Sequence, residues 1–212
     1  MNKTYAAYFF DFDGVIADSV EIKTEAFRTL FIDYGPLVVR NVANHHRENG
    51  GMPRREKFEH YLRHFLETEP TPKRIDHMCA LFSGIVVDKV VAAPEIPGAL
   101  DYIRKAAAKA PCFIISGTPD EELGQIVKRR GLAPFFREIM GSGKKKPQHL
   151  AATLTKYNLS AAECVFFGDA GSDFKAARAN GVPFIGILPG PDAPLLKQHP
   201  TIRWHTNFEE SN

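Results

Sequence analysis

Two aspartates at the end of an apolar run are the residues whose type and spacing most clearly indicate chemistry. Residues 8–10 are aromatic, and Asp11, Asp13 and Gly14 follow them, which is typical of a buried strand that ends in two carboxylates and a turn. Like charges held this close raise each other's pKa unless a cation neutralises them. Carboxylate oxygens suit magnesium, which shares its shell with water and substrate phosphate. Aspartate can also act as a covalent nucleophile.

Two other structures, a plain turn and a calcium-binding loop, are alternatives to a metal site in this segment. Aspartate and glycine are ordinary turn residues, so the segment taken alone also fits a plain turn. A calcium-binding EF-hand loop requires glycine at its sixth position and glutamate at its twelfth. Counting from Asp11, these positions hold Ile16 and Ile22. The sequence therefore excludes an EF-hand loop here.

A hydroxyl group follows a second apolar run. Ser116 comes after residues 112–115 and precedes Gly117, Thr118 and Pro119. Such a segment presents side-chain and backbone donors to a phosphate oxygen. The acids that follow predict a helix with Thr118 at its N-cap and Pro119 at N1. We expect Ser116, Gly117 and Thr118 to line a phosphate site, with Thr118 also capping the helix.

A third apolar run, residues 165–168, ends at Asp169, and Asp173 lies four residues further on. Residues four apart on a helix share a face, so both carboxylates can point to the same place. Gly168 permits close backbone approach beside them. These two aspartates are therefore further candidate metal ligands.

A run of three lysines, residues 144–146, lies before Pro147 and offers a candidate active-site cation. Gly143-Lys144 also suggests a P-loop, but that motif needs glycine five places earlier and Ser or Thr directly afterwards. Glu138 and Lys145 occupy those places, so a P-loop is excluded.

In order and local context, these four signatures resemble the haloacid dehalogenase superfamily of aspartate-nucleophile phosphotransferases. The resemblance extends from Tyr5 to about Leu188 and is closest to the branch of β-phosphoglucomutase and phosphoglycolate phosphatase. It implies that Asp11 is the nucleophile and a magnesium ligand. It implies that Asp13 is the general acid and base and contacts the metal through its backbone carbonyl. An acid at position 13 also favours phosphate ester chemistry over dehalogenation.

The same resemblance assigns the remaining signatures. Ser116 is expected to bind the transferring phosphoryl group, and Lys146, with Lys145 as the alternative register, to neutralise it. Asp169 is expected to bind magnesium directly, and Asp173 to bind it through water or to support the lysine.

Composition narrows the possible partners and location. A net charge of +2 and a pI of about 8.4 are too mild to indicate a nucleic-acid partner. Cys79, Cys112 and Cys164 lie far apart, so neither zinc nor a disulfide framework is indicated. The first residues do not resemble a signal peptide, and no apolar run reaches membrane-spanning length. We therefore expect a cytoplasmic protein without a membrane partner, as a monomer or weak homodimer.

Apolar runs alternate with helical patterns, which predicts an α/β fold with a doubly wound parallel sheet. The expected strands are 5–10, 111–116, 137–141, 163–168 and 182–188, and the expected helices are 97–109, 119–130, 147–157 and 172–180. Gly131 and Gly181 lie where helix C-caps are expected. From about Ala17 to Ala92 only helical patterns occur. The predicted domains are therefore a core of residues 1–16 and 93–212 and an inserted helical cap of residues 17–92.

The cap is expected to choose the substrate, because the core recognises only phosphate and metal. Between Arg40 and His64 there are six Lys or Arg, four His and three acids, around a loop at residues 49–53. The candidate substrate contacts are Arg47, Asn49, Arg54 and Arg55. The neighbouring His45 and His46 lack a third zinc ligand at useful spacing, so we expect them to be solvated or capping residues. Basic groups facing the core would suit a leaving group with a carboxylate or several hydroxyls.

The sequence thus predicts a magnesium-dependent phosphatase of a small phosphorylated metabolite that works through an aspartyl phosphate. A sugar phosphate, a phosphorylated sugar acid and a phosphoglycolate-like compound are the candidate substrates. A phosphomutase of the β-phosphoglucomutase type remains an alternative, since it uses the same residues. A receiver-like signalling module or a binding protein is an alternative of another class, although receivers are shorter and lack the long insertion.

Overall fold

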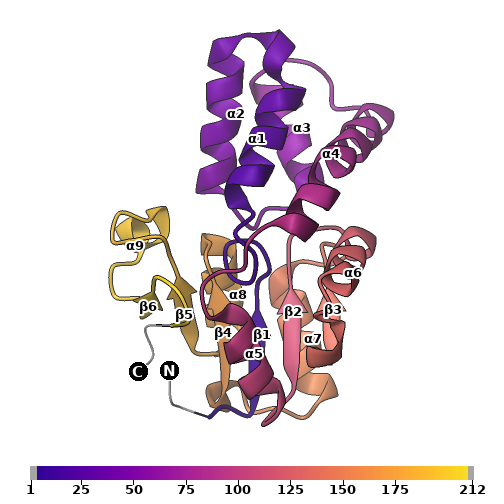
Figure 1. The fold of residues 1–212 in the computed structure, drawn as a ribbon. Helices are drawn as coiled ribbons and strands as arrows, with labels where there is room; N and C mark the ends of the chain where they lie inside the picture. Colours follow the sequence, from indigo (N-terminus) through magenta and orange to yellow (C-terminus); the bar gives the residue numbers. More distant parts are fainter. Residues whose placement is uncertain (1–3, 210–212) are drawn as a thin grey trace.

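In this computed structural model, which describes residues 4–209, six strands form one parallel sheet in the order β3-β2-β1-β4-β5-β6 (Figure 1). The strands are β1 (Ala7–Phe10), β2 (Cys112–Ile115), β3 (Glu138–Met140), β4 (Cys164–Gly168), β5 (Phe184–Ile187) and β6 (Trp204–His205). Every paired strand runs parallel to its neighbour. The α/β class and the parallel sheet predicted from the sequence are therefore confirmed.

The central strands are apolar along their whole length because helices cover both faces of the sheet. All residues of β1, β2 and β4 are buried. On one face Phe10 stacks on Phe167, with ring centroids 5.2 Å apart, and on the other Phe9 stacks on Phe113 at 5.0 Å. Alternate residues of β1 thus belong to two separate cores.

Two helices cover each face of the sheet. Helices α5 (Ala99–Ala107) and α6 (Asp120–Arg129) pack on the face that carries Phe10. Helices α7 (Lys146–Lys156) and α8 (Gly171–Ala179) pack on the face that carries Phe9. The short helix α9 (Pro194–Gln198) lies beside β5 and β6, and three 3-10 turns are η1 (Ile32–Tyr34), η2 (Ala133–Phe135) and η3 (Ala161–Glu163).

The predicted glycine stops after α6 and α8 are confirmed. Gly131 and Gly181 adopt φ of 70° and 68°, a left-handed conformation that a side chain disfavours. Helix α9 and strand β6 are additions that the sequence patterns did not predict.

Four helices stand over the carboxyl ends of the strands and are called the cap below (Figure 1). They are α1 (Val20–Leu30), α2 (Pro36–Glu48), α3 (Arg54–His64) and α4 (Pro72–Ala92). Their shared centre is aromatic: Phe27 contacts Phe58, Tyr61 and Phe82, with ring centroids 5.4, 5.6 and 4.3 Å away. The cap therefore has a packed interior of its own.

Two connecting segments join the cap to the sheet and lie side by side. The amide of Asp18 donates to the carbonyl of Pro94 at 2.9 Å, and the amide of Ile96 donates to that of Ile16 at 3.0 Å.

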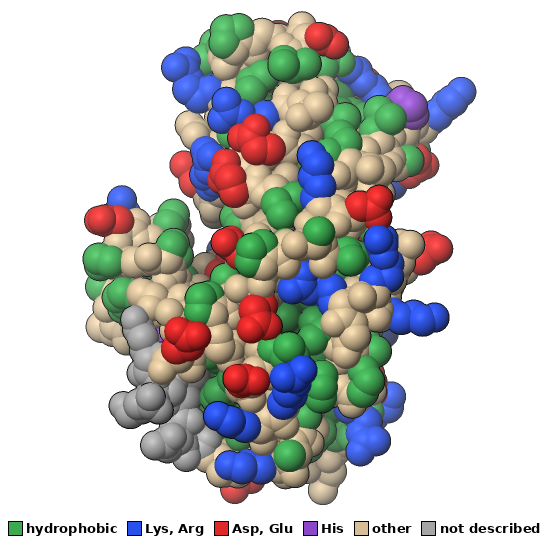
Figure 2. Space-filling model, in the orientation of Figure 1, with side chains coloured by type: hydrophobic (Ala, Val, Ile, Leu, Met, Phe, Trp, Pro, Cys, Tyr) green, Lys and Arg blue, Asp and Glu red, His purple; other side chains and the backbone are tan. Residues whose placement is uncertain are grey.

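Figure 2 shows acidic and basic side chains interspersed over the visible face of cap and core. Among the described residues, no helix combines the length and apolarity required to cross a bilayer.

Candidate active site

Three aspartates gather at the carboxyl edge of the sheet. Asp11 follows β1 and Asp169 follows β4, and these strands are neighbours, with the amide of Asp11 donating to the carbonyl of Phe167 at 2.9 Å. Asp173 lies in the first turn of α8. One carboxylate oxygen from each of the three lies within 4.8 Å of the others. The structure therefore brings three of the four predicted metal ligands, Asp11, Asp169 and Asp173, to one place.

The aspartate cluster is electrostatically unfavourable without a cation. Burial raises the pKa of Asp169, and the neighbouring charges of Asp11 and Asp173 raise it further. Burial and Asp11 likewise raise the pKa of Asp173, although Lys146 acts in the opposite direction. Oxygen donors from clustered carboxylates suit a hard divalent cation. The donor set therefore fits a metal site.

Lys146 supplies a cation directly to this cluster. Its Nζ lies 2.8 Å from Oδ2 of Asp11 and 2.6 Å from Oδ1 of Asp173. Burial disfavours the charged amine, but the two carboxylates outweigh it and raise the pKa of Lys146. Lys145 is exposed, so the geometry selects Lys146 rather than the alternative register. The side chain that reaches the aspartates is permanently charged at neutral pH.

Asp13 faces a different set of partners from Asp11. Its carboxylate accepts hydrogen bonds from Lys23 Nζ at 2.5 Å, Ser19 Oγ at 2.6 Å and Thr118 Oγ1 at 3.2 Å. Although burial acts in the opposite direction, the charge and hydrogen bond of Lys23 lower the pKa of Asp13. Its side chain lies outside the three-carboxylate cluster, so any metal contact from this residue falls to its backbone.

The segment after β2 approaches the cap. Ser116 is buried, and its Oγ accepts a hydrogen bond from the Thr118 amide at 3.2 Å. A Cβ on Gly117 would lie 3.0 Å from the carbonyl oxygen of Gly51 in the cap loop. Glycine at this position therefore lets the cap loop come this close to the segment after β2.

The prediction that Thr118 caps α6 is wrong. The helix begins at Asp120 with Pro119 at its N-cap and no side-chain capping bond. The Thr118 hydroxyl instead accepts a hydrogen bond from Lys23 Nζ at 2.7 Å and donates to Asp13. The hydroxyl therefore bonds Asp13 of the core and Lys23 of the cap, and it does not cap the helix.

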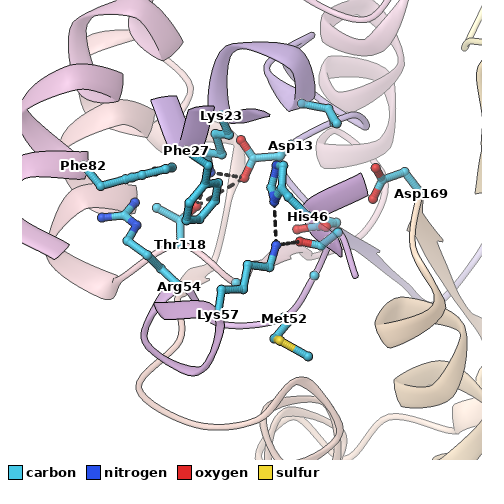
Figure 3. A pocket seen from close by; sticks show the side chains of 15 residues that line it. Asp13, Lys23, Phe27, His46, Met52, Arg54, Lys57, Phe82, Thr118 and Asp169 are labelled. Atoms are coloured by element: carbon cyan, nitrogen blue, oxygen red, sulfur yellow. Dashed lines mark hydrogen bonds and ion pairs between the residues drawn. The ribbon is translucent and has the colours of Figure 1, made fainter. Parts of the chain in front are cut away.

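The loop between α2 and α3 separates two cavities. The smaller cavity, of about 40 Å³, is lined from the core by Asp11, Asp13, Gly117, Thr118 and Asp169, and from the cap by Val20, Lys23, Phe27, His46, Gly50, Gly51, Met52, Arg54, Lys57 and Phe82 (Figure 3). The larger cavity, of about 490 Å³, lies on the other side of the loop and reaches Ser116 and Lys146. A Cβ on Gly51 would lie 1.9 Å from Ser172 Oγ. The loop thus rests directly on the core.

Two of the four predicted cap contacts do not reach either cavity. Arg47 is exposed and pairs with Glu21 at 2.8 Å, and Arg55 is exposed and pairs with Asp76. Both side chains are exposed on their helices, which sequence spacing could not reveal. Asn49 lines the larger cavity, and its Nδ2 donates to the His45 carbonyl at 3.0 Å.

Arg54 does line the smaller cavity, but its guanidinium is already occupied. It forms a two-pronged ion pair with Glu122 of α6, at 2.6 and 2.9 Å, and donates to Ser83 Oγ of α4 at 2.7 Å. Its guanidinium also lies over the Phe82 ring, 4.2 Å from the centroid. Arg54 therefore joins the cap to the core, and Glu122 and Ser83 engage three of its five N–H donors.

Three cavity residues were missed as candidates from the sequence: Lys23, His46 and Lys57. The expectation that His46 is solvated or capping is wrong, because its ring is buried and its Nδ1 lies 2.7 Å from Lys57 Nζ. His45 instead stacks on His60, with centroids 4.2 Å apart. For His46 and Lys57 the only signal was the charge density around residues 40–64, which did not distinguish inward from outward residues, and Lys23 lies outside that range.

The sequence and the fold of this chain resemble those of known proteins. Residues 5–181 match the model of the haloacid dehalogenase-like hydrolases. A phosphorylated carbohydrates phosphatase of Thermotoga maritima is 25% identical over 186 residues, covering 83% of this chain and 82% of the relative. A phosphoglycolate phosphatase of Yersinia pseudotuberculosis is 26% identical over 207 residues, covering 85% and 80%. The solved structure of a CbbY mutant from Rhodobacter sphaeroides with xylulose-(1,5)bisphosphate has the same fold, with a TM-score of 0.76, 20% identity, and coverage of 98% and 96%.

Proposed function

The chain belongs to the haloacid dehalogenase-like hydrolases, and we propose that it is a magnesium-dependent phosphatase that cleaves a small phosphorylated metabolite through an aspartyl phosphate. The observation that carries this proposal is the contact of Lys146 with both Asp11 and Asp173, beside Asp169. It supports the proposal because Asp11, the proposed nucleophile, then lies beside a charged amine and a cluster of oxygen donors. Phosphoryl transfer needs this combination of positioning and charge stabilisation.

Asp11, Asp169 and Asp173 are the residues that would hold magnesium, and the bound ion would neutralise charge on the phosphate. Lys146 pairs with Asp11 and adds a second positive charge beside the transferring group. Ser116 and the Gly117 amide lie at the end of the neighbouring strand, where their donors suit phosphoryl oxygens. These groups together form the phosphate-binding half of the proposed site.

The proposed reaction has two displacement steps at phosphorus. A carboxylate oxygen of Asp11 attacks, the bond to the ester oxygen breaks, and Asp13 donates its proton to the departing oxygen. Asp13 then takes a proton from water, whose oxygen attacks the aspartyl phosphate and releases phosphate and free Asp11. Lys23 holds Asp13 ionised in the free enzyme. The phosphate dianion arriving beside Asp13 raises its pKa, so Asp13 takes up a proton from solvent on substrate binding and then donates it to the departing oxygen.

The cap, which we propose to consist of residues 17–92, would select the rest of the substrate. The relatives include phosphatases of phosphorylated carbohydrates and of phosphoglycolate. Sugar phosphates, phosphorylated sugar acids and phosphoglycolate-like compounds are therefore the proposed substrate range. The small cavity between cap and core is where the non-phosphate part would lie.

Conservative removal of the two N-terminal carboxylates tests the proposal. Asp11→Asn should abolish phosphate release from a panel of phosphate monoesters, and Asp13→Asn should lower it by roughly a hundred- to ten-thousand-fold. Asp18→Asn is the matched control, because Asp18 is exposed on the same connecting segment. A magnesium chelator should silence the wild type. Wild-type turnover by Asp11→Asn would refute the proposed function.

A further inference from the structure

Lys57 of α3 is a buried amine at the boundary of cap and core. Only 2% of its surface is exposed, and it lines the smaller cavity (Figure 3). Its Nζ contacts the His46 Nδ1 at 2.7 Å and the Gly50 carbonyl oxygen at 3.2 Å. Both partners are neutral acceptors, whereas an ammonium group has three donors. One donor of Lys57 is therefore available to the cavity.

The other cationic side chains of this cavity already have counterions. Lys23 pairs with Asp13, and Arg54 pairs with Glu122. Within residues 4–209, no carboxylate lies within ion-pair distance of Lys57. Lys57 is thus the cavity cation whose charge the described part of the protein does not neutralise by direct contact.

An uncompensated buried cation is unfavourable. Removing an ammonium group from water costs several kcal/mol unless an opposite charge is close. Burial and the charge of Lys23 lower the pKa of Lys57 to about 7, while Asp13 and Asp169 offset this only in part. An anion entering the cavity would remove the penalty and keep the amine charged.

His46 gives Lys57 a fixed direction. When Lys57 is charged, its ammonium group donates to Nδ1, and the proton of the neutral ring then lies on Nε2. The ring packs against Phe27, with centroids 4.9 Å apart, and is itself buried. Because the ring cannot turn freely, His46 is a positioning residue for the amine.

We propose that Lys57 binds a negatively charged group on the leaving part of the substrate and makes the enzyme selective for anionic leaving groups. This inference rests on the proposed phosphatase function, since the same cavity reaches Asp11 and Asp13. The cavity of about 40 Å³ holds about three waters if one water needs roughly 10–15 Å³. A compact carboxylate on a short chain fits this space.

A matched pair of esters tests the selectivity. The probes are 2-phosphoglycolate and its neutral amide, which differ in the charge of the leaving group and hardly in size. Lys57→Met and Lys57→Gln should lower kcat/KM for the carboxylate by roughly 10- to 100-fold, as expected for a lost charge-assisted hydrogen bond. The amide should change little. Arg55→Met is the control, because Arg55 is exposed on the same helix.

Binding to an inactive protein gives a second readout that does not depend on turnover. Calorimetry of Asp11→Asn, with and without Lys57→Met, should show tighter binding of the carboxylate ester only when Lys57 is present. Equal losses for both esters, or no loss for either, would overturn the role of Lys57. If neither Lys57 variant folds, a wild type that binds the two esters equally overturns it as well. Carboxylate-selective binding without any phosphate release would instead refute the phosphatase and leave the anion site standing.

Discussion

The ion pair between Arg54 and Glu122 provides a stringent test of how the cap is fixed to the core. It joins α3 to α6, both partners are buried, and Ser83 of α4 donates to the Glu122 carboxylate at 2.6 Å. Arg54→Met would leave a buried carboxylate with one hydroxyl partner. Glu122→Leu would leave a buried guanidinium with that hydroxyl and the Phe82 ring.

Each single variant is expected to lose about 3–5 kcal/mol of unfolding free energy, as is usual when one member of a buried pair is removed. The double variant Arg54→Met/Glu122→Leu replaces both charges by apolar groups of similar volume. It should lie within about 2 kcal/mol of the wild type, because neither charge is then stranded. The two single losses are therefore expected to be strongly non-additive.

Urea unfolding followed by circular dichroism measures these free energies. Arg55→Met serves as the control, since the exposed pair of Arg55 with Asp76 should contribute at most about 1 kcal/mol. Similar losses for Arg54→Met and Arg55→Met would refute the buried-pair reasoning. So would a double variant whose loss equals the sum of the singles.

The contribution of the Arg54–Glu122 pair to stability should change with pH in one direction. Burial raises the pKa of Glu122, but the hydrogen bond and charge of Arg54, with Ser83, outweigh it and lower the pKa below its usual value of 4.5. Stability from this group is therefore present above pH 4.5 and is lost as the pH falls through the lowered value. The stability gap between wild type and Glu122→Gln should narrow as the pH falls below 4.5. A gap that widens in acid would contradict the direction of the shift.

Two further predictions concern the groups around Asp11. Gly51→Ala should lower kcat/KM with little loss of folding stability. The added Cβ would lie 1.9 Å from Ser172 Oγ and 3.1 Å from Lys146 Nζ, so it would push the cap loop off the core. Steady-state kinetics beside Gly84→Ala, where a Cβ meets nothing within 4 Å, provide the check, and equal kinetics for the two would contradict it. Lys146→Met should destabilise the metal-free protein by about 3 kcal/mol or more. Its melting temperature should also respond more strongly to added magnesium than that of the wild type. An unchanged melting temperature without metal would contradict the role of Lys146 in neutralising the aspartates.

Much of the core could be predicted because each element leaves a local signature. The buried strands β1, β2 and β4 are continuous apolar runs, and the glycines after α6 and α8 mark left-handed helix ends. Parallel strands end at the same edge, so Asp11 and Asp169 had to lie near each other once the sheet was recognised. Strand β6 and helix α9 escaped notice because segments this short carry too little periodicity.

The cap shows the opposite case. The sequence shows that it is rich in basic residues but not which of these side chains point toward the core. Arg47, Arg54, Arg55 and Lys57 occur close together in the sequence, yet Arg54 and Lys57 are buried while Arg47 and Arg55 are exposed. Side chains project from a helix in all directions around its axis. The packing of α1 to α4 determines which side chains face the core. A count of charged residues in the sequence therefore does not show which of them are buried.

By itself, the sequence determined the parallel sheet, the placing of the aspartates at its carboxyl edge and the glycines that let the backbone turn, because these depend on local pattern and strand direction. Only the tertiary structure decided that Lys23 binds Asp13 and Thr118, that Arg54 is held by Glu122 and that Lys57 faces the cavity without a carboxylate partner among the described residues. Lys23 and Thr118 lie far apart in the chain, as do Arg54 and Glu122. Their partners are chosen by how the cap packs on the core, which no local spacing records.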